Sequence, residues 1–238
     1  MDNKQLNIIG FIFARGGSKG VPGKNIKKIA GKPLITYSIE AGLASQYINK
    51  IIVSTDDPQI AQVAIEAGAQ VPFMRPGELA TDQSPEWLSW QHAIRQVQDQ
   101  GGQLDIFVSI PATAPLRLSH DIDLCIKTLI EDDNADMVIT VAKAQHHPDF
   151  NMITMTTDGY ANLAGNLGKT ICRRQDAAAM YDMTTVAYVA RPGFIMKSRS
   201  MFDGKIKPIV IPRSRALDID TQFDFKIARL LIEDEQKR

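Results

Sequence analysis

The chain has 238 residues, 44% of them hydrophobic, and its 27 basic and 27 acidic side chains cancel to a formal net charge of zero. This size and composition predict a single α/β domain over residues 1–238, and the balanced charge argues against a nucleic-acid partner, since such domains usually carry a basic excess. No apolar run reaches the roughly 18 residues that a membrane span needs, and the polar N-terminus lacks a signal-peptide pattern. We therefore expect a cytoplasmic protein that does not bind membranes.

Strand and helix patterns alternate through the first half of the chain. Short apolar runs predict strands at residues 7–13, 50–55, 105–110 and 137–141. Helices are predicted at residues 33–45, 58–67, 84–99 and 120–131, the last with Ser119 as its N-cap. The third helix has an apolar face, formed by Trp87, Trp90, Ile94 and Val97. This alternation predicts a three-layer α/β/α fold, in which helices cover both faces of a mostly parallel sheet.

The pattern changes after about residue 143. Two short apolar stretches on either side of Asp158-Gly159 predict a β-hairpin, and residues 164–182 read as irregular. Later elements are predicted as strands at 186–189 and 206–211 and as a helix at 222–235, capped by Thr221 with Asp224 three residues on. We interpret residues 143–185 as an excursion from the main sheet that serves in dimerisation.

The loop at residues 14–25 carries the clearest chemical signal. It follows a buried strand and holds four glycines, Arg15, Lys19 and Lys24. Glycines let backbone N–H groups approach an anion, and the cations neutralise its charge. The spacing matches neither a P-loop nor a dinucleotide fingerprint, and a solvated turn is the alternative. We favour a polyphosphate cradle, and we expect the loops at 54–57 and 111–117, which also follow strands, to converge on it.

A second signal is Asp218-Ile219-Asp220. Residues two apart on an extended segment point to the same side, and two carboxylates held together repel unless a cation lies between them. Oxygen ligands suit Mg²⁺. The alternative is that these acids favour the N-terminus of the following helix through its dipole, and the local pattern alone does not decide between the two.

A third cluster, Arg173-Arg174-Gln175-Asp176, could bind an acidic ligand, because guanidinium groups pair with carboxylates and phosphates. Taken alone, the pattern favours a surface ion-pair cluster. The pair His146-His147 has no cysteine or acid at metal-ligand spacing, so we interpret it as part of a loop.

Several blocks, in order along nearly the whole chain, resemble the CMP-sialic acid synthetases, or acylneuraminate cytidylyltransferases. The blocks are ARGGSKGVPGKN at 14–25, GKPL at 31–34, VSTDD at 53–57, RPGELATD at 75–82, ATAPLR at 112–117, RQD at 174–176 and DIDT at 218–221. The resemblance implies a nucleotide-diphospho-sugar transferase fold, which is Rossmann-like. It also implies an enzyme that joins CMP from CTP to an acidic sugar and releases pyrophosphate.

The resemblance further implies roles for individual residues. CTP would be bound by Arg15, Gly16, Gly17, Ser18, Lys19, Lys24, Asn25, Arg75 and Ser84. Mg²⁺ would be bound by Asp218 and Asp220, which would act in catalysis together with Lys19 and Lys24. The sugar acid would lie near Arg174, Gln175 and Tyr188, and the protein would be a homodimer.

Three positions depart from the sialic acid enzymes. Pro111-Ala112 stands in place of a Gln-Pro pair, Phe150 in place of a lysine, and Asp182-Met183-Thr184-Thr185 in place of an Arg-x-Asn-Gly stretch. All three belong to the sugar side of the family pattern, while the nucleotide side is kept. We therefore expect a nine-carbon (nonulosonic) acceptor other than N-acetylneuraminate, such as legionaminic or pseudaminic acid, in the biosynthesis of surface polysaccharides.

Other functions stay open at this stage. One is a sugar nucleotidyltransferase for a Kdo-type acid, and another is a non-catalytic module that binds nucleotide sugars. The paired carboxylates argue against the module, because binding alone needs no metal pair. The absent dinucleotide fingerprint argues against an NAD-linked oxidoreductase.

Overall fold

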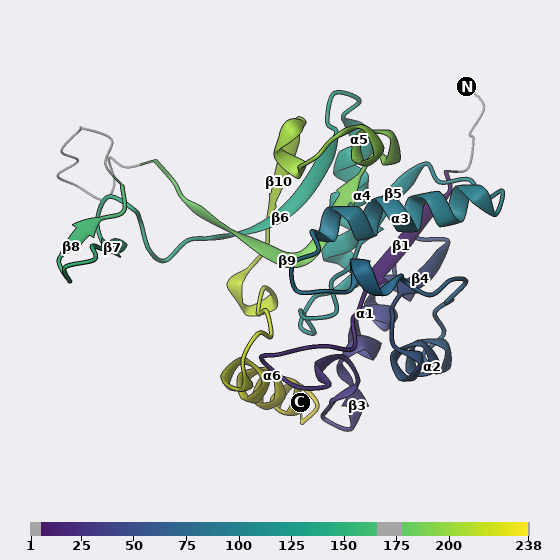
Figure 1. Ribbon diagram of the computed structural model, residues 1–238, viewed down its shortest axis with the longest axis horizontal. Helices are drawn as coiled ribbons and strands as arrows, with labels where there is room; N and C mark the ends of the chain where they lie inside the picture. Colours follow the sequence, from purple (N-terminus) through teal and green to yellow (C-terminus); the bar gives the residue numbers. More distant parts are fainter. Residues whose placement is uncertain (1–5, 166–177, 238) are drawn as a thin grey trace.

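A six-stranded sheet runs through the molecule, which is described here by a computed structural model for residues 6–165 and 178–237 (Figure 1). The strand order is β10-β6-β9-β5-β1-β4. The bounds are β1 Ile8–Phe13, β4 Lys50–Ser54, β5 Ile106–Ser109, β6 Met137–Lys143, β9 Tyr181–Ala190 and β10 Ile206–Val210. All neighbours are parallel except β9, which is antiparallel to β5 and β6. The prediction of a mostly parallel sheet is confirmed.

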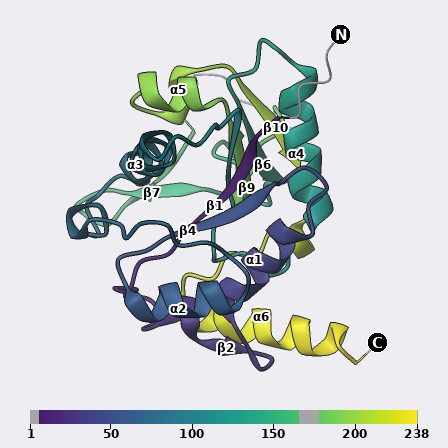
Figure 2. The same ribbon diagram turned by 90° about the vertical axis from the view of Figure 1, so that its right-hand side faces the viewer.

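Helices cover both faces of this sheet (Figure 2). Their bounds are α1 Leu34–Leu43, α2 Pro58–Glu66, α3 Glu86–Asp99, α4 Ser119–Glu131, α5 Pro192–Lys197 and α6 Gln222–Glu235. Side chains of α1, α2 and α4 bury against one face, and side chains of α3 and α5 bury against the other. The three-layer α/β/α architecture is therefore confirmed, and α5 is an element that the sequence pattern did not predict.

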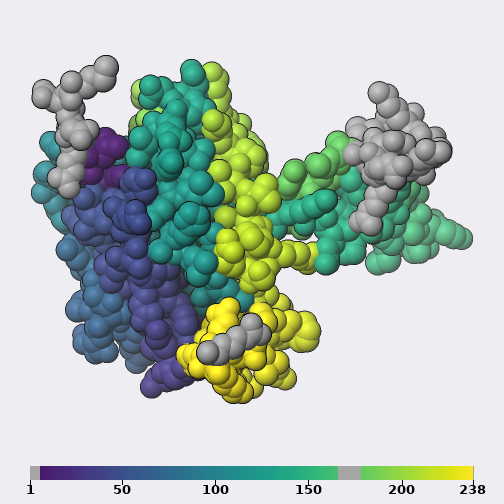
Figure 3. Space-filling view, turned by 180° about the vertical axis from the view of Figure 1, so that it is seen from behind, coloured from purple at the N-terminus to yellow at the C-terminus, as the bar shows by residue number. Residues whose placement is uncertain are grey.

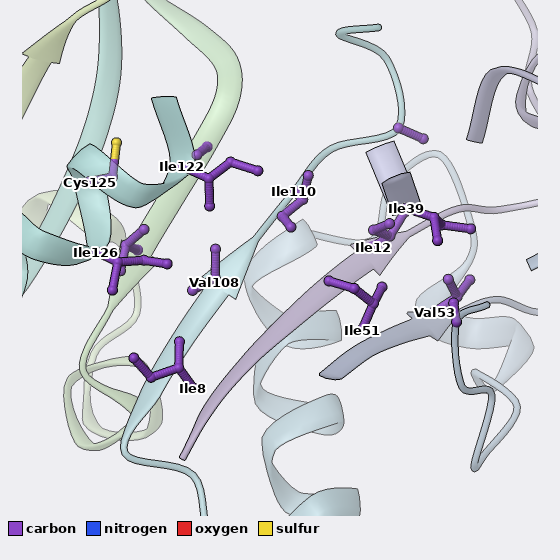
Figure 4. Close-up of a cluster of buried hydrophobic side chains, with 14 of the residues drawn as sticks. Ile8, Ile12, Ile39, Ile51, Val53, Val108, Ile110, Ile122, Cys125 and Ile126 are labelled. Carbon is purple, nitrogen blue, oxygen red and sulfur yellow. The ribbon is translucent and has the colours of Figure 1, made fainter. Parts of the chain in front are cut away.

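The central strands are buried on both faces because successive side chains point to opposite sides. In β1, Ile8 and Ile12 join the first core cluster, while Ile9 and Phe11 join the second. Figure 4 shows the first cluster, where isoleucines of the strands face Ile39 and the α4 side chains. The second cluster contains the predicted apolar face of α3, including Trp87 and Trp90.

A third apolar cluster joins the two ends of the chain. Val21 follows β1, Ile219 precedes α6, and Phe225 lies on α6; all three are buried together. Figures 2 and 3 show α6 beside the part of the chain that carries the small hairpin of β2 (Lys28–Ile29) and β3 (Lys32–Pro33). The α6 bounds and its Thr221 cap, which accepts from the Asp224 N–H, agree with the prediction. This packing brings two distant segments to one place.

Two local predictions are wrong. Ser119 is not the N-cap of α4 but its first residue, and the Asp121 side chain accepts from the Leu118 N–H at 3.1 Å in place of a serine cap. The irregular stretch ends earlier than expected, because β9 begins at Tyr181, which pairs with Lys143. The polar and exposed start of this strand carries no strand pattern of its own and is ordered by pairing with β6.

The predicted hairpin is present and stands away from the body of the molecule (Figures 1 and 3). It consists of β7 (Ile153–Met155) and β8 (Ala161–Leu163), and Gly159 in the turn has a φ of 87°. We call residues 143–182, as far as they are described, the arm. In the described part of the chain, no helix has both the length and the apolar character required to cross a membrane.

Candidate active site

A cleft of about 560 Å³ lies at the carboxyl ends of β1 and β5. Its walls contain most of the residues predicted to form the site: Arg15, Ser18, Lys19, Lys24, Asn25, Arg75, Ser84, Tyr188, Asp218 and Asp220. Gly16 and Gly17 are not in its lining, although a role in CTP binding was predicted for them. Arg174 and Gln175 lie outside the described residues.

The three loops expected to converge do so. The Ala14 N–H donates to the Ser54 carbonyl at 3.1 Å, and the Gly16 N–H donates to Asp56 Oδ1 at 3.1 Å. Residues 111–113, which follow β5, form part of the same cleft. The topological argument from parallel strands therefore places the loop 14–25 correctly.

Gly16 has a structural reason to be glycine. A Cβ at this position would lie 2.7 Å from Asp57 Oδ2. Asp57 is the N-cap of α2 and accepts from the Gln59 N–H at 2.7 Å, so its carboxylate is fixed in place. This glycine therefore allows the loop to pack against the start of α2.

The loop holds its shape through Asn25 and a left-handed glycine. The Asn25 amide donates to the Arg15 carbonyl at 3.0 Å, and its side chain is buried. Gly23 has a φ of 63°, which a residue with a side chain rarely adopts. These contacts fix the turn that carries Ser18 and Lys19 at the edge of the cleft.

The same loop docks directly on the segment 218–220. A Cβ on Gly20 would lie only 2.1 Å from the Asp220 carbonyl oxygen, so the close approach requires glycine. Lys24 Nζ donates to the Ile219 carbonyl and lies 3.4 Å from Asp220 Oδ1. The cations of the loop and the carboxylates near the C-terminus therefore form one wall of the cleft.

Asp218 is held in an environment that disfavours its charge. Burial raises the pKa of the Asp218 carboxyl, and the charge of Asp220 adds to this, while the Thr113 and Thr185 hydroxyls oppose it. Within the described residues, Asp218 Oδ1 is enclosed by protein and makes no hydrogen bond of normal geometry. A buried carboxylate oxygen that lacks a well-formed hydrogen bond and lies near a second carboxylate is what a bound cation would satisfy.

At this site the described residues offer the two carboxylates of Asp218 and Asp220. Among the described residues, no group of three or more His, Cys, Asp or Glu side chains could hold a metal ion. Mg²⁺ commonly takes one or two carboxylates and completes its shell with substrate phosphates and water. The pair Asp218 and Asp220 fits that mode of binding.

The cleft cations are already paired with carboxylates. Asp82 lies between two of them, with its Oδ1 at 2.6 Å from Arg15 Nη2 and its Oδ2 against Lys19 Nζ. The Lys19 hydrogen bond is the main cause that holds the pKa of Asp82 below its ordinary value. Arg75, which also lines the cleft, lies 3.7 Å from Asp56. Asp82 was not assigned a role from the sequence, because this pairing is a long-range contact.

Arg117 was also not assigned a role, although it ends one of the family-like blocks. It is 4% exposed and donates to the carbonyls of Pro111 and Thr185, the latter at 2.9 Å. Burial lowers the pKa of Arg117 to about 9, and the charges of Asp218 and Asp121 oppose this effect. Arg117 therefore joins the loop after β5 to β9 beneath the Asp218 carboxylate, and it positions the floor of the cleft.

The remaining wall is aromatic and acidic. Tyr188 lines it, and burial raises the pKa of its hydroxyl to about 12. Glu86, at the start of α3, accepts from the Trp90 indole at 3.2 Å. Of the three departures from the sialic acid enzymes, Pro111-Ala112 and Thr185 line the cleft, whereas Phe150 lies on the arm.

Comparison with known proteins identifies the class. Residues 9–205 match the family described as "Cytidylyltransferase", so the chain belongs to the cytidylyltransferases and is a nucleotidyltransferase. It is 33% identical over 229 residues to the post-translational flagellin modification protein B of Campylobacter coli, with 96% of each chain covered.

Two further relatives have names that state a reaction. The chain is 33% identical to a pseudaminic acid cytidylyltransferase of Campylobacter jejuni, covering 92% of this chain and 94% of the relative. It is 31% identical to a CMP-N,N'-diacetyllegionaminic acid synthase of Legionella pneumophila, covering 98% and 99%. Among solved structures, a CMP:2-keto-3-deoxy-manno-octonic acid synthetase complexed with CTP matches with a TM-score of 0.73 at 18% identity, covering 97% of this chain and 99% of that one. At that identity the match confirms the fold.

Proposed function

We propose that this cytidylyltransferase transfers CMP from CTP to a nonulosonic acid of the pseudaminic or legionaminic type and releases pyrophosphate. One observation carries the proposal: the loop 14–25 and the carboxylates of Asp218 and Asp220 form a single wall of one cleft. The names of the full-length relatives support the class of acceptor. In this reaction the anomeric hydroxyl of the acid attacks the α-phosphorus of CTP.

The chain contributes charge and position. Arg15, Lys19 and Lys24 lie together along the cleft, where they would neutralise a triphosphate and stabilise the pyrophosphate as it leaves. Holding nucleotide and acid in one cleft makes the attack effectively intramolecular. Arg117 acts through its neighbours, because its hydrogen bonds fix the backbone of Pro111 and Thr185 on the acceptor side.

We include Mg²⁺ in the proposal. Asp218 and Asp220 would hold the ion, and the unpartnered Oδ1 of Asp218 supports this assignment. A bound ion supplies charge stabilisation to the phosphate oxygens. Lys24 beside Asp220 keeps that carboxylate directed toward the same wall.

We also propose that the arm mediates a homodimer. Its hairpin exposes apolar side chains, with Ile153 59%, Met155 78% and Tyr160 72% exposed. Exposed apolar surface on a projecting element is typical of a protein interface. Sedimentation of the intact chain beside Met155→Asp should show a dimer that the substitution weakens; a monomer in both samples would contradict this part of the proposal.

A substrate panel tests the activity. The purified protein is assayed for pyrophosphate release with each of the four nucleoside triphosphates and with pseudaminic, N,N'-diacetyllegionaminic, N-acetylneuraminic and Kdo-type acids. We expect release with CTP and the highest kcat/KM with a pseudaminic- or legionaminic-type acid. The highest kcat/KM with N-acetylneuraminate would contradict the acceptor, and preference for the Kdo-type acid would support that alternative. Nucleotide binding without any release would support a non-catalytic module.

A further inference from the structure

Residues 212–218, which we call the connection, join the edge strand β10 to the carboxylate pair of the cleft. Before the connection, the Ile211 N–H donates to the Val141 carbonyl at 2.7 Å and so continues the pairing with β6. After it, the Ile219 N–H donates to the Thr113 carbonyl at 2.9 Å, in the loop that follows β5. The path of the connection between these two points therefore decides where the two carboxylates lie.

Arg215 anchors the connection through its side chain. It lies in the short helical turn η5 (Arg213–Arg215), three residues before Asp218. Its guanidinium donates twice to one carboxylate, from Nε to Asp121 Oδ2 at 2.9 Å and from Nη2 to Asp121 Oδ1 at 2.8 Å. A bidentate pair of this kind fixes direction as well as distance. The turn is therefore held against its partner in one orientation.

The partner carboxylate is itself held in place. Asp121 lies in the first turn of α4 and is 1% exposed. Its Oδ2 also accepts from the N–H of Leu118, which directly follows the cleft loop 111–117, at 3.1 Å. A buried carboxylate needs such partners, because it has lost its contacts with water. Asp121 thus joins two segments of the cleft, the loop after β5 and, through Arg215, the connection.

The carboxylate pair at the end of the connection needs a fixed support. Asp218 and Asp220 carry like charges and repel each other until a cation lies between them. The Ile219 backbone fixes one point of this stretch, and Arg215 fixes a second point before it, so that together they set its direction. Ligands held in place beforehand bind an ion without having to rearrange.

We infer that Arg215 is a positioning residue for the metal site, because its pair with Asp121 holds Asp218 and Asp220 where they receive Mg²⁺. This inference rests on the proposed function and adds to it a residue outside the cleft lining. Arg215 acts through the segment that it holds and not by contact with either substrate. Its loss should therefore change the dependence of the reaction on Mg²⁺ and not only the stability of the fold.

Kinetics with a matched pair of variants test this role. Arg215→Lys keeps the charge but loses the bidentate contact, which lysine cannot form. Arg213→Lys is the control, because Arg213 lies in the same turn, is exposed and does not line the cleft. With saturating CTP and acceptor, the free Mg²⁺ concentration for half-maximal rate should rise about tenfold in Arg215→Lys and less than about twofold in the control, the former being the scale of disturbing the support of a metal ligand.

Thermal melts set an assay temperature at which each variant is folded. Arg215→Gln, which keeps a hydrogen-bond donor without the charge, should shift the Mg²⁺ dependence in the same direction as Arg215→Lys. An unchanged Mg²⁺ dependence in the folded variants, with or without a lower Tm, would overturn the inference and leave the pair with Asp121 a purely structural contact. An equal shift in Arg213→Lys would also overturn it, because the general charge of the turn would then be responsible.

Metal binding can also be measured without turnover. Mn²⁺ alone, titrated into the protein and followed by the EPR signal of the free ion, should bind about tenfold more weakly to Arg215→Lys than to the wild type. Asp220→Asn should weaken the same binding; equal Mn²⁺ affinity in the wild type and either variant would overturn the inference. Weaker Mn²⁺ binding by Arg215→Lys, with a wild-type protein that releases no pyrophosphate, would support the positioning role and contradict the proposed activity.

Discussion

The two sides of the cleft differ in how tightly their residues are held by contacts within the protein. On the nucleotide side, the loop 14–25 docks on segment 218–220 through Gly20 and Lys24, and the contact is sealed by the third apolar cluster. On the other side, Pro111, Thr185 and Tyr188 line the cleft, and outside the cleft lining Phe202 and the projecting arm expose large apolar side chains. The nucleotide side is fixed by its own internal contacts, whereas the acceptor side leaves side chains free to meet a ligand.

The difference explains why the departures from the sialic acid enzymes fall where they do. A substitution at Gly20 would disrupt a backbone contact, while a change at Met183 alters only an exposed side chain of β9. Exposed positions on a rigid scaffold can change specificity at little cost to the fold. A scaffold of this kind can keep its nucleotide side while its acceptor side changes.

The largest effect is expected at Asp220. Asp220→Asn should lower kcat at least roughly 100-fold, the scale of losing one key electrostatic group, while the Tm stays unchanged because the side chain is 74% exposed. Steady-state pyrophosphate release and a thermal melt measure the two quantities. A kcat near the wild type would remove Asp220 from the site.

Lys19→Ala should also lower turnover at least roughly 100-fold, because this lysine would face the triphosphate. Lys28→Ala is the matched control: Lys28 lies in the same basic stretch but not in the cleft lining. Equal losses in the two variants would mean that general positive charge, rather than the geometry of the nucleotide side, supports activity.

Gly20→Ala tests the docking of the loop on segment 218–220. The added Cβ would clash with the Asp220 carbonyl oxygen, so we expect kcat/KM to fall on the order of tenfold or more as the two segments separate. Gly193→Ala, on α5, is the control, because a Cβ at Gly193 meets no atom within 4 Å and this residue does not line the cleft. If both variants kept full activity, the two segments would not need their close contact.

Asp82→Asn is expected to strengthen CTP binding, in contrast to the losses expected for the preceding variants. Asp82 binds Arg15 and Lys19 in the place where phosphate oxygens would bind, so its neutralisation should lower the KM for CTP, by about threefold given the small worth of exposed ion pairs. Glu78→Gln removes a nearby charge that lies outside the cleft lining and serves as control. A raised KM would show that Asp82 positions the cations instead.

The smallest effect concerns stability. Because burial raises the pKa of Asp218, the folded chain binds its proton more tightly than the unfolded chain, and the free energy of unfolding falls as pH rises through that range. Asp218→Asn should therefore have a higher Tm than the wild type above about pH 4, and the difference should grow toward neutral pH. Melts at several pH values measure this, with Asp158→Asn, at an exposed position in the hairpin turn, as control. A loss of Tm at neutral pH would contradict it.

Much of the fold follows from local patterns. Apolar runs and helical periodicity predicted the central strands and α1 to α4, and the Thr221 capping box predicted the start of α6. The start of β9 was missed because Tyr181 and Asp182 are exposed and owe their strand conformation to β6. The α4 cap was missed because a side chain inside the helix, Asp121, replaces the serine.

The candidate site also has a part that local sequence patterns predicted and a part that they did not. The loop 14–25 and the carboxylates at 218 and 220 were predicted because each signal is a pattern of glycines, cations or acids within one short segment of the sequence. The contacts of Asp82 with Arg15, and the burial of Arg117 beneath Asp218, join residues far apart in the sequence. A second cavity of about 400 Å³ likewise combines residues of α3, β9 and 199–202, and no single segment of the sequence predicts it.

The central claim is that loop 14–25 and segment 218–220 form one site, at which CMP is transferred from CTP to a sugar acid. ³¹P NMR of a single reaction tests it most directly, with CTP, Mg²⁺ and a pseudaminic- or legionaminic-type acid. We predict that the CTP signals are replaced by those of a CMP phosphodiester and pyrophosphate, only when acid and Mg²⁺ are both present, and not with Asp220→Asn. Pyrophosphate with free CMP in the absence of the acid would contradict the account and indicate a pyrophosphohydrolase.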